Sequence, residues 1–307
     1  MSRDRFRAEI AAARALLEAH GLETDAPGPA TLPAMPLPGL LAQCHAMLDA
    51  AAAQPPAPIR TLHHFACTGG TLICRCLAGL PNVRLLSEVD PLSTLDTGRE
   101  GFFPSDLPSL ARAGSRPPGA EVLVEVFLAG LGALQDDCRR HGLDLVLRDH
   151  AHSHFCTGPD IADRPGLRGI VGGAHPLRSV VSVRHPFESW LSLLDRDWLH
   201  FTPATVEEYA RRYHAFLDHH AGLEILRYED FLADPEGRMQ WLCGVLDLRP
   251  DPGFRDTLLA IRLSGDSGRR GDIIAPRPRR PHTPAQVQAA LASQWFTSLL
   301  DRLGYTM

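Results

Sequence analysis

The feature that most constrains the fold is an alternation, after residue 58, of short apolar runs with segments of helical periodicity. The apolar runs have the length of strands and cover residues 59–66, 83–88, 143–149, 179–184 and 223–228. The helical patterns cover residues 71–80, 121–141, 187–194, 206–219 and 235–246. Strands that alternate with helices imply βαβ crossovers, and therefore a parallel sheet with both faces covered. We expect an α/β fold, a three-layer sandwich around a central parallel sheet of about five strands.

The first 56 residues have a different pattern. Apolar side chains at helical spacing predict a helix over residues 3–20 that ends at Gly21. A proline-rich stretch over 27–38 separates it from a second helix over roughly 39–53, and the Gln54-Pro55-Pro56-Ala57-Pro58 run marks a boundary. We therefore expect an N-terminal helical extension over 1–56 and one main domain over 57–307.

The charge of the chain gives no general reason to bind a polyanion. The net charge is −5 and the pI is about 6.3, so neither nucleic acid nor an anionic membrane is an expected partner. No apolar stretch approaches the ~20 residues that a membrane span needs, and the start of the chain lacks the apolar core of a signal peptide. A cytoplasmic location is the default expectation.

The cysteine and lysine contents narrow the chemistry further. The seven cysteines are odd in number, scattered and without a CxxC pair, which argues against a disulfide framework and a zinc ribbon. The chain contains no lysine, so its 31 basic residues are all arginines. Any anion site must therefore use arginine, backbone N–H groups or hydroxyls.

Ligands of parallel α/β sheets bind at the carboxyl ends of the strands. After the first run, Cys67, Thr68, Gly69, Gly70 and Thr71 open a helix. The glycines let backbone N–H groups approach an anion, the helix N-terminus adds positive potential, and the threonines add hydroxyl donors. The segment is not a Walker A loop, because GxxxxGK[ST] is absent. It indicates an anion-binding loop, although a Thr-Gly-Gly-Thr segment by itself is also an ordinary turn.

Three later segments carry arginines that suit a phosphate. Arg184 stands at a strand end with Ser192 eight residues later, where both can hold one phosphate; the alternative is an arginine paired with a nearby carboxylate. The run from Leu226 to Pro235 follows the fifth strand and contains Tyr228. A loop over 264–272 can close over a phosphate, or be a solvated basic turn, and contains Arg269, Arg270 and Gly271.

In this order, the four segments resemble the family of sulfotransferases that use 3′-phosphoadenosine 5′-phosphosulfate (PAPS), from about Arg60 to Tyr305. The resemblance implies that the Cys67 to Thr71 loop, which is P-loop-like, binds the 5′-phosphosulfate. It also implies that Arg184 and Ser192 bind the 3′-phosphate and that Tyr228 lies near the adenine. The Arg269, Arg270 and Gly271 loop corresponds to a late arginine- and glycine-containing loop of the family. PAPS is then the co-substrate, and residues 57–307 form a sulfotransferase domain.

Sulfuryl transfer needs a base for the proton of the acceptor and a cation for the leaving phosphate. The resemblance offers two bases on an equal footing, Glu88 after the second strand and His150 after the third, with Arg148 in place of a nearby lysine. The alternative for Glu88 is a carboxylate at a helix N-terminus, and the alternative for His150 is a hydrogen-bonded histidine that only shapes the pocket. Cys67 departs from the family, which commonly has Lys or Arg there, so Arg148, Arg75, His64 or the Arg269-Arg270 loop must substitute.

Other functions stay open at this stage. A P-loop-like kinase is disfavoured by the missing lysine, and a non-catalytic nucleotide-binding protein is compatible with Cys67. A metallohydrolase would use His150, His152 and His154, which alternation in an extended segment would place on one side; we otherwise expect no metal. Residues 91–119 are a candidate substrate lid. The acceptor is a small molecule, a carbohydrate or a peptide with a hydroxyl or amine, and homodimer formation is left open.

Overall fold

The computed structural model describes residues 39–53, 56–95, 107–113, 115–261, 263 and 273–307, together with helical positions 11, 12, 15, 16 and 19. The chain divides into two compact units, Met1–Pro55 and Pro56–Met307. In the first unit, helix α2 (Leu40–Ala53) confirms the second predicted helix. The predicted helix over 3–20 lies outside the described residues apart from the five positions above, which are helical. None of the described helices is both long and apolar enough to cross a bilayer.

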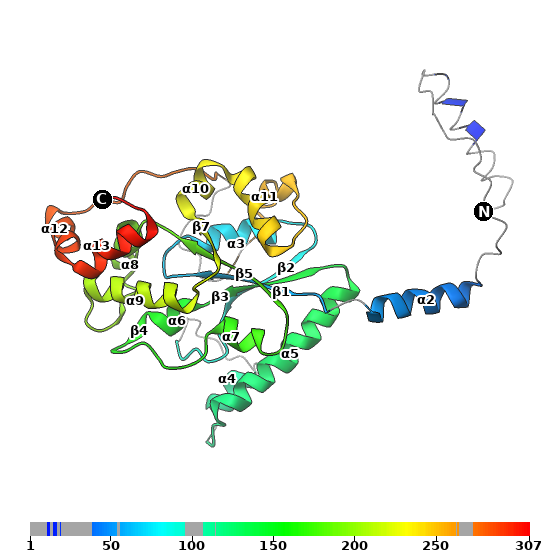
Figure 1. The fold of residues 1–307 in the computed structure, drawn as a ribbon, viewed down its shortest axis with the longest axis horizontal. Coiled ribbons are helices and arrows are strands. Elements are labelled where there is room, and N and C mark those ends of the chain that lie inside the picture. Colours follow the sequence, from blue (N-terminus) through cyan, green and yellow to red (C-terminus); the bar gives the residue numbers. More distant parts are fainter. Residues whose placement is uncertain are drawn as a thin grey trace. The chain divides into compact units, whose positions relative to one another are not determined.

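The second unit contains a parallel sheet of five strands in the order β2-β3-β1-β5-β7, which confirms the predicted fold class (Figure 1). The strands are β1 (Ile59–His64), β2 (Val83–Val89), β3 (Asp144–Asp149), β5 (Leu177–Val183) and β7 (Glu224–Arg227). β1 lies at the centre, where Thr61 pairs with Leu147 of β3 and with Ser179 of β5. Its side chains are buried on both faces, as a central parallel strand requires.

Helices cover both faces of the sheet, as Figure 1 shows. One face packs on α3 (Gly70–Ala78) and α11 (Pro235–Leu246), through a core that includes Leu62, Val146 and Val180. The other face packs on a further set of helices, in clusters that include Leu147 and Val181. These helices are α5 (Ala120–Arg140), α7 (Leu167–Gly172), α8 (Pro186–Arg196), α9 (Val206–His219) and α13 (Gln294–Leu303). The predictions of α3, α5, α8, α9 and α11 are confirmed.

The shorter elements were not predicted. They are α4 (Leu107–Ala113), α6 (Ala151–Phe155), α10 (Tyr228–Ala233), α12 (Pro284–Ala292), the two-residue strands β4 (Thr157–Gly158) and β6 (His200–Phe201), and a 3₁₀ turn at Pro252–Arg255. The helices α7 and α13 were not predicted either. Helices of five to seven residues, such as α6, α10 and α4, show too few turns for a periodic pattern. Their places in the structure are fixed by tertiary contacts.

The strand order determines where a ligand can bind. The chain leaves β1 toward the β3-β2 edge and leaves β5 toward the β7 edge, so the connections diverge between β1 and β5. Such a switch point opens a crevice at the carboxyl ends of the two strands. The loop after β1 and the Arg184 segment after β5 therefore meet there, as the sequence predicted.

Candidate functional site

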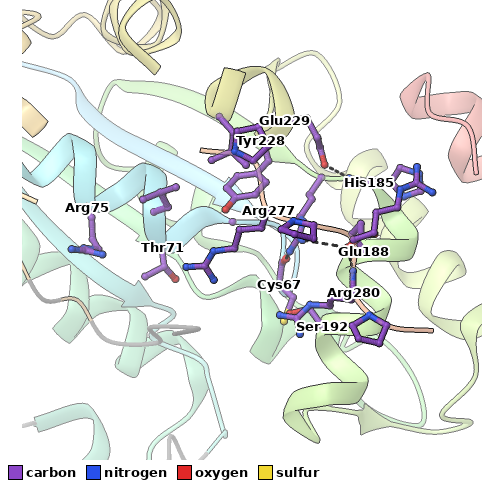
Figure 2. A pocket seen from close by; sticks show the side chains of 18 residues that line it. Cys67, Thr71, Arg75, His185, Glu188, Ser192, Tyr228, Glu229, Arg277 and Arg280 are labelled. Atoms are coloured by element: carbon purple, nitrogen blue, oxygen red, sulfur yellow. Dashed lines mark hydrogen bonds and ion pairs between the residues drawn. The ribbon is translucent and has the colours of Figure 1, made fainter. Parts of the chain in front are cut away.

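A cavity of about 490 Å³ opens at this switch point (Figure 2). Six of its lining residues belong to the predicted nucleotide site: Cys67, Gly69, Thr71, Arg184, Ser192 and Tyr228. The remaining lining residues are Leu72, Arg75, His185, Glu188, Glu229, Leu232, and the segment Pro276, Arg277, Pro278, Arg279, Arg280 and Pro281. The volume of the cavity is in the range of small-molecule sites, and its arginines suit a phosphorylated ligand.

The loop after β1 has a backbone that only particular residues can adopt. Cys67 has φ 61°, which is unusual for a residue with a side chain, and Gly69 has φ 90° immediately before α3. A Cβ on Gly69 would lie 2.3 Å from the Tyr228 ring, and a Cβ on Gly70 would lie 2.2 Å from the His64 ring. Both glycines are required by close packing, which brings the N-terminus of α3, the positive end of the helix dipole, to the cavity.

The two threonines of this loop have different roles. The hydroxyl of Thr68 donates to the carbonyl of Phe65 at 2.7 Å, and the Thr68 side chain is fully buried beneath the turn. Thr68 therefore stabilises the loop in this structure and does not line the cavity. Thr71 does line it, and its hydroxyl accepts a hydrogen bond from Arg148.

Arg184 and Ser192 meet the loop from the other side of the crevice. The Arg184 guanidinium donates to the Cys67 carbonyl at 3.3 Å and lies 5.3 Å from the centre of the Tyr228 ring. Arg184 Nη2 is also 3.7 Å from Glu188 Oε2. The second interpretation of Arg184, as an arginine paired with a nearby carboxylate, is therefore also met in this structure. Glu188 and Ser192 are four residues apart on α8, which places them on the same face of that helix. All of these groups border one cavity, as a phosphate site requires.

Cys67 has a thiol, not a cation, at the cavity wall. Burial raises the pKa of the Cys67 thiol, against the opposing effects of a hydrogen bond with Ser192 and the charge of Arg184. The thiol therefore stays protonated and carries no charge at neutral pH. Cys67 therefore gives the cavity no positive charge, and any positive charge there comes from other residues.

Tyr228 is held by a network at the end of β7. It begins α10 and is followed by Glu229, which accepts hydrogen bonds from the His185 backbone and from the Tyr305 hydroxyl. The Arg227 guanidinium lies 4.0 Å from the centre of the Tyr305 ring. The C-terminal residues thus brace the strand end that presents Tyr228 to the cavity.

The segment 276–281 was missed by the sequence reasoning. Its residues Arg277, Arg279 and Arg280 line the cavity, and Figure 2 shows the side chains of Arg277 and Arg280 beside the other lining residues. Arg280 pairs with Asp195 at 2.7 Å, whereas no ion pair joins Arg277 or Arg279 to another described residue. A run of three arginines between prolines was the available signal. The predicted Arg269, Arg270 and Gly271 lie outside the described residues, so their role stays a prediction.

Arg148 connects the anion loop to the candidate bases. It is 3% exposed, and it donates to Thr71 Oγ1 at 2.8 Å, to Ser87 Oγ at 3.0 Å and to His64 Nε2 at 2.9 Å. Its Nη1 also lies 2.7 Å from Glu88 Oε1. A single guanidinium therefore spans the loop after β1, the end of β2 and its own strand β3.

Glu88 and His150 lie together, so the two candidate bases are neighbours. His150 Nε2 is 3.4 Å from Glu88 Oε2. The pairing of β2 with β3 shifts register between Leu86 and Val89, and Glu88 there has φ 60°. Irregularities of this kind redirect a side chain and are frequent at functional sites. The local strain turns Glu88 toward Arg148 and His150.

The other candidates for the missing cation are committed elsewhere. Burial, reinforced by the charge of Arg148, lowers the pKa of His64 well below its ordinary value, so its ring is neutral and accepts from Arg148. Arg75 donates to the backbone carbonyls of Leu258 and Ile261. Among the candidates that the structure describes, Arg148 is the one that brings a positive charge into hydrogen-bond contact with the loop, at Thr71.

Solved structures with a similar fold are sulfotransferases or sulfotransferase domains. The sulfotransferase domain of the curacin biosynthetic pathway matches with 14% identity and a TM-score of 0.49, over 83% of this chain and 100% of that one. The sulfotransferase domain of the Synechococcus PCC 7002 olefin synthase matches with 17% identity and a TM-score of 0.43, over 83% and 97%. The mouse sulfotransferase SULT7A1, complexed with PAP, matches with 10% identity and a TM-score of 0.40, over 80% and 88%.

No protein-family model matches the chain, and no curated protein matches it in sequence.

The prediction that residues 150–154 form an extended segment, as a metallohydrolase site would need, is wrong. Residues 151–155 form the helix α6, so alternate side chains do not share a side. His154 contacts the carbonyl of Ala162 at 3.0 Å, and the His152 ring lies beside His200, 5.2 Å between centres. The three histidines therefore do not converge on one point.

Proposed function

We propose that this chain is a sulfotransferase that moves a sulfuryl group from PAPS to a hydroxyl or amine of an acceptor. The observation that carries the proposal is the placement of Arg148, which joins Thr71 of the anion loop to the Glu88–His150 pair. It puts a cation, a phosphate-binding loop and a proton acceptor at the carboxyl ends of three neighbouring strands.

The donor would occupy the cavity between β1 and β5. The N-terminus of α3 and Thr71 would hold the 5′-phosphosulfate, and Arg184 with Ser192 would hold the 3′-phosphate. Tyr228, whose ring covers Gly69, would lie against the adenine. Arg277 and Arg279 would contribute further positive charge from the outer wall.

Sulfuryl transfer requires the protein to position the donor and the acceptor, to stabilise the developing charge and to remove a proton. In-line transfer of the sulfuryl group leaves negative charge growing on the 5′-phosphate, and a buried guanidinium beside it stabilises that charge. Arg148 meets this need in place of the residue that Cys67 does not supply. The Glu88–His150 pair would take the proton of the acceptor as the new S–O or S–N bond forms.

Calorimetry with three nucleotides tests the donor. We expect 3′-phosphoadenosine 5′-phosphate to bind at least about tenfold more tightly than adenosine 5′-phosphate, because one charged contact is worth roughly 1.5–3 kcal/mol. Arg184→Ala should remove that difference. The matched control is Arg178→Ala, an exposed arginine on β5, the strand that Arg184 directly follows. An equal affinity for the two nucleotides, or tighter binding of ATP with Mg²⁺, would overturn the donor assignment in favour of a kinase.

Turnover separates an enzyme from a nucleotide-binding protein. The wild-type chain, supplied with PAPS and a mixture of phenolic, carbohydrate and peptide acceptors, should release 3′-phosphoadenosine 5′-phosphate faster than without acceptor. Tight binding of the nucleotide with no release above the water background for any acceptor would favour the non-catalytic alternative.

A further inference from the structure

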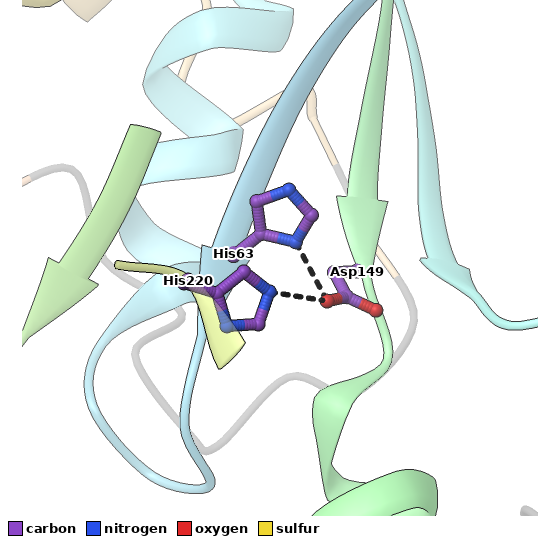
Figure 3. A group of neighbouring side chains, drawn as sticks. All are labelled: His63, Asp149 and His220. Atoms are coloured by element: carbon purple, nitrogen blue, oxygen red, sulfur yellow. Dashed lines mark hydrogen bonds and ion pairs between the residues drawn. The ribbon is translucent and has the colours of Figure 1, made fainter. Parts of the chain in front are cut away.

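A second group of polar side chains lies behind the Arg148 site, on the other face of the sheet. His63 precedes His64 on β1, Asp149 follows Arg148 on β3, and neighbouring residues of a strand point to opposite faces. His220, the residue after α9, completes the group (Figure 3). All three side chains are buried, His63 completely.

The two histidine rings converge on one oxygen of the Asp149 carboxylate. His63 Nδ1 is 2.7 Å from Asp149 Oδ2, and His220 Nε2 is 3.8 Å from the same oxygen. Figure 3 shows both rings turned toward the carboxylate, and the three ligand atoms lie within 4.8 Å of one another. Two imidazoles and one carboxylate are a donor set that binds divalent transition metals.

The hydrogen bond on the far side of His220 fixes the state of its ring. His220 Nδ1 is 2.8 Å from the Phe216 carbonyl, which can only accept, so Nδ1 carries the hydrogen. Nε2 of the neutral ring then presents a lone pair toward a carboxylate oxygen. Two acceptors that face each other at 3.8 Å in a buried place repel one another, and a cation or a proton between them would remove that repulsion.

The far side of His63 can adapt to such a cation. His63 Nε2 is 2.9 Å from the Thr61 hydroxyl, which is 2.7 Å from the Ser179 hydroxyl. Hydroxyls donate or accept by rotation, so Nε2 can carry the hydrogen and leave Nδ1 as a ligand. Outer hydrogen bonds of this kind orient metal-binding histidines in known sites.

We propose that His63 Nδ1, Asp149 Oδ2 and His220 Nε2 bind one divalent cation of the zinc class. The site joins β1, β3 and the end of α9 directly behind the strand ends that carry His64 and Arg148. Three protein ligands leave one tetrahedral position for a water molecule or a further ligand. The role is structural, and it is independent of the sulfotransferase proposal.

Elemental analysis tests the site. Untagged protein is produced in medium that contains zinc and purified without chelators, because the burial of the ligands requires the metal to enter during folding. We expect about one zinc per chain, and binding weakened at least about tenfold in His220→Gln, since even outer-sphere changes cost 10–100-fold. His175→Gln, outside the group, is the matched control.

Cobalt gives a second readout that does not depend on activity. Protein produced with cobalt should show the visible d–d absorption of a nitrogen- and oxygen-ligated ion, and Asp149→Asn, which keeps the size of the side chain, should abolish it. A folded wild-type chain with less than about a tenth of an equivalent of metal and no cobalt spectrum would overturn the proposal. A shared proton would then take the place of the cation.

Discussion

Two buried arginines in this molecule have opposite kinds of partners. Arg212 on α9 is fully buried, pairs with Glu208, and donates to the backbone carbonyls of Phe155, Thr157, Gly158 and Pro159. Arg148 is almost as buried, but its partners are side chains at the ends of β1 and β2 and at the start of α3.

The difference shows what each arginine does. Backbone carbonyls take no part in chemistry, so the four donors that Arg212 directs at them hold the chain from the end of α6 through β4 in place. Side chains such as Thr71 and Glu88 can bind a ligand or exchange a proton, so Arg148 can act on a reaction. Burial alone does not separate a structural arginine from a functional one; the partners do.

The largest effect is expected from Arg212→Met. Removing one partner of a buried, charged network costs about 3–5 kcal/mol, because the carbonyls and Glu208 lose their donors. Denaturation in urea, with the midpoint and slope compared with wild type, measures this loss. Arg211→Met, which removes the more exposed partner of Glu208, should cost under about 1 kcal/mol. Equal effects of the two substitutions would contradict the comparison.

Arg148→Met should lower the rate of the reaction more than the stability of the fold, the reverse of Arg212→Met. We expect the rate of sulfate transfer to fall about 100- to 1000-fold, as when one group that stabilises developing charge is removed. Affinity for 3′-phosphoadenosine 5′-phosphate should change less than the rate. Arg148→Lys should recover part of kcat, because it restores the charge without the forked geometry. A rate loss that only follows the loss of folded protein would make Arg148 structural, like Arg212.

The pair beside Arg148 should act as one unit. Glu88→Gln or His150→Asn alone should lower kcat by about 100-fold or more, the usual contribution of a general base. The double variant should be little slower than the slower single variant, because residues that act together are not additive. Steady-state kinetics of the three variants measure this. Losses that multiply would show two independent roles.

The smallest effect is the pH dependence of the Arg212 region. Burial acts to raise the pKa of Glu208, but hydrogen bonds from Arg211 and Arg212 outweigh it, and the net shift is below the ordinary value of 4.5. The carboxylate therefore stabilises the folded state above pH 4.5, and this contribution is lost as the pH falls through the lower, folded-state pKa. Urea midpoints between pH 6 and 3 should show a shallower decline in Glu208→Gln than in wild type; parallel curves would refute the assignment.

The sequence predicted the sheet and its long helices well. The five strands and the helices α3, α5, α8, α9 and α11 have clear periodicity over enough residues to be distinguished. The short helix α6 was missed because it has too few residues to show a period. The expectation that His150, His152 and His154 share a side was wrong for the same reason. A five-residue segment carries no helical period, and its conformation depends on packing.

The candidate site was predictable where a motif coincided with a strand end. Cys67, Arg184 and Tyr228 each follow a strand, and parallel strands bring their carboxyl ends to one edge, so their meeting followed from topology. Thr68 was expected to face the anion, yet its hydroxyl bonds to Phe65. Which way a turn hydroxyl points depends on the turn itself. The arginines of 276–281 form a visible run between prolines, but their return to the cavity from far along the chain depends on the tertiary structure.

The sequence by itself determined the class of fold, the order of its elements and the chemistry available, including arginine as the sole basic residue apart from histidine. Only the tertiary structure decided which arginine meets Thr71, that Glu88 and His150 are neighbours, and that His63 and His220 share one carboxylate oxygen. Periodicity records which face of an element is buried, because burial is a property of each residue. Partnership is a property of two residues distant in sequence, and it is fixed only when the elements pack.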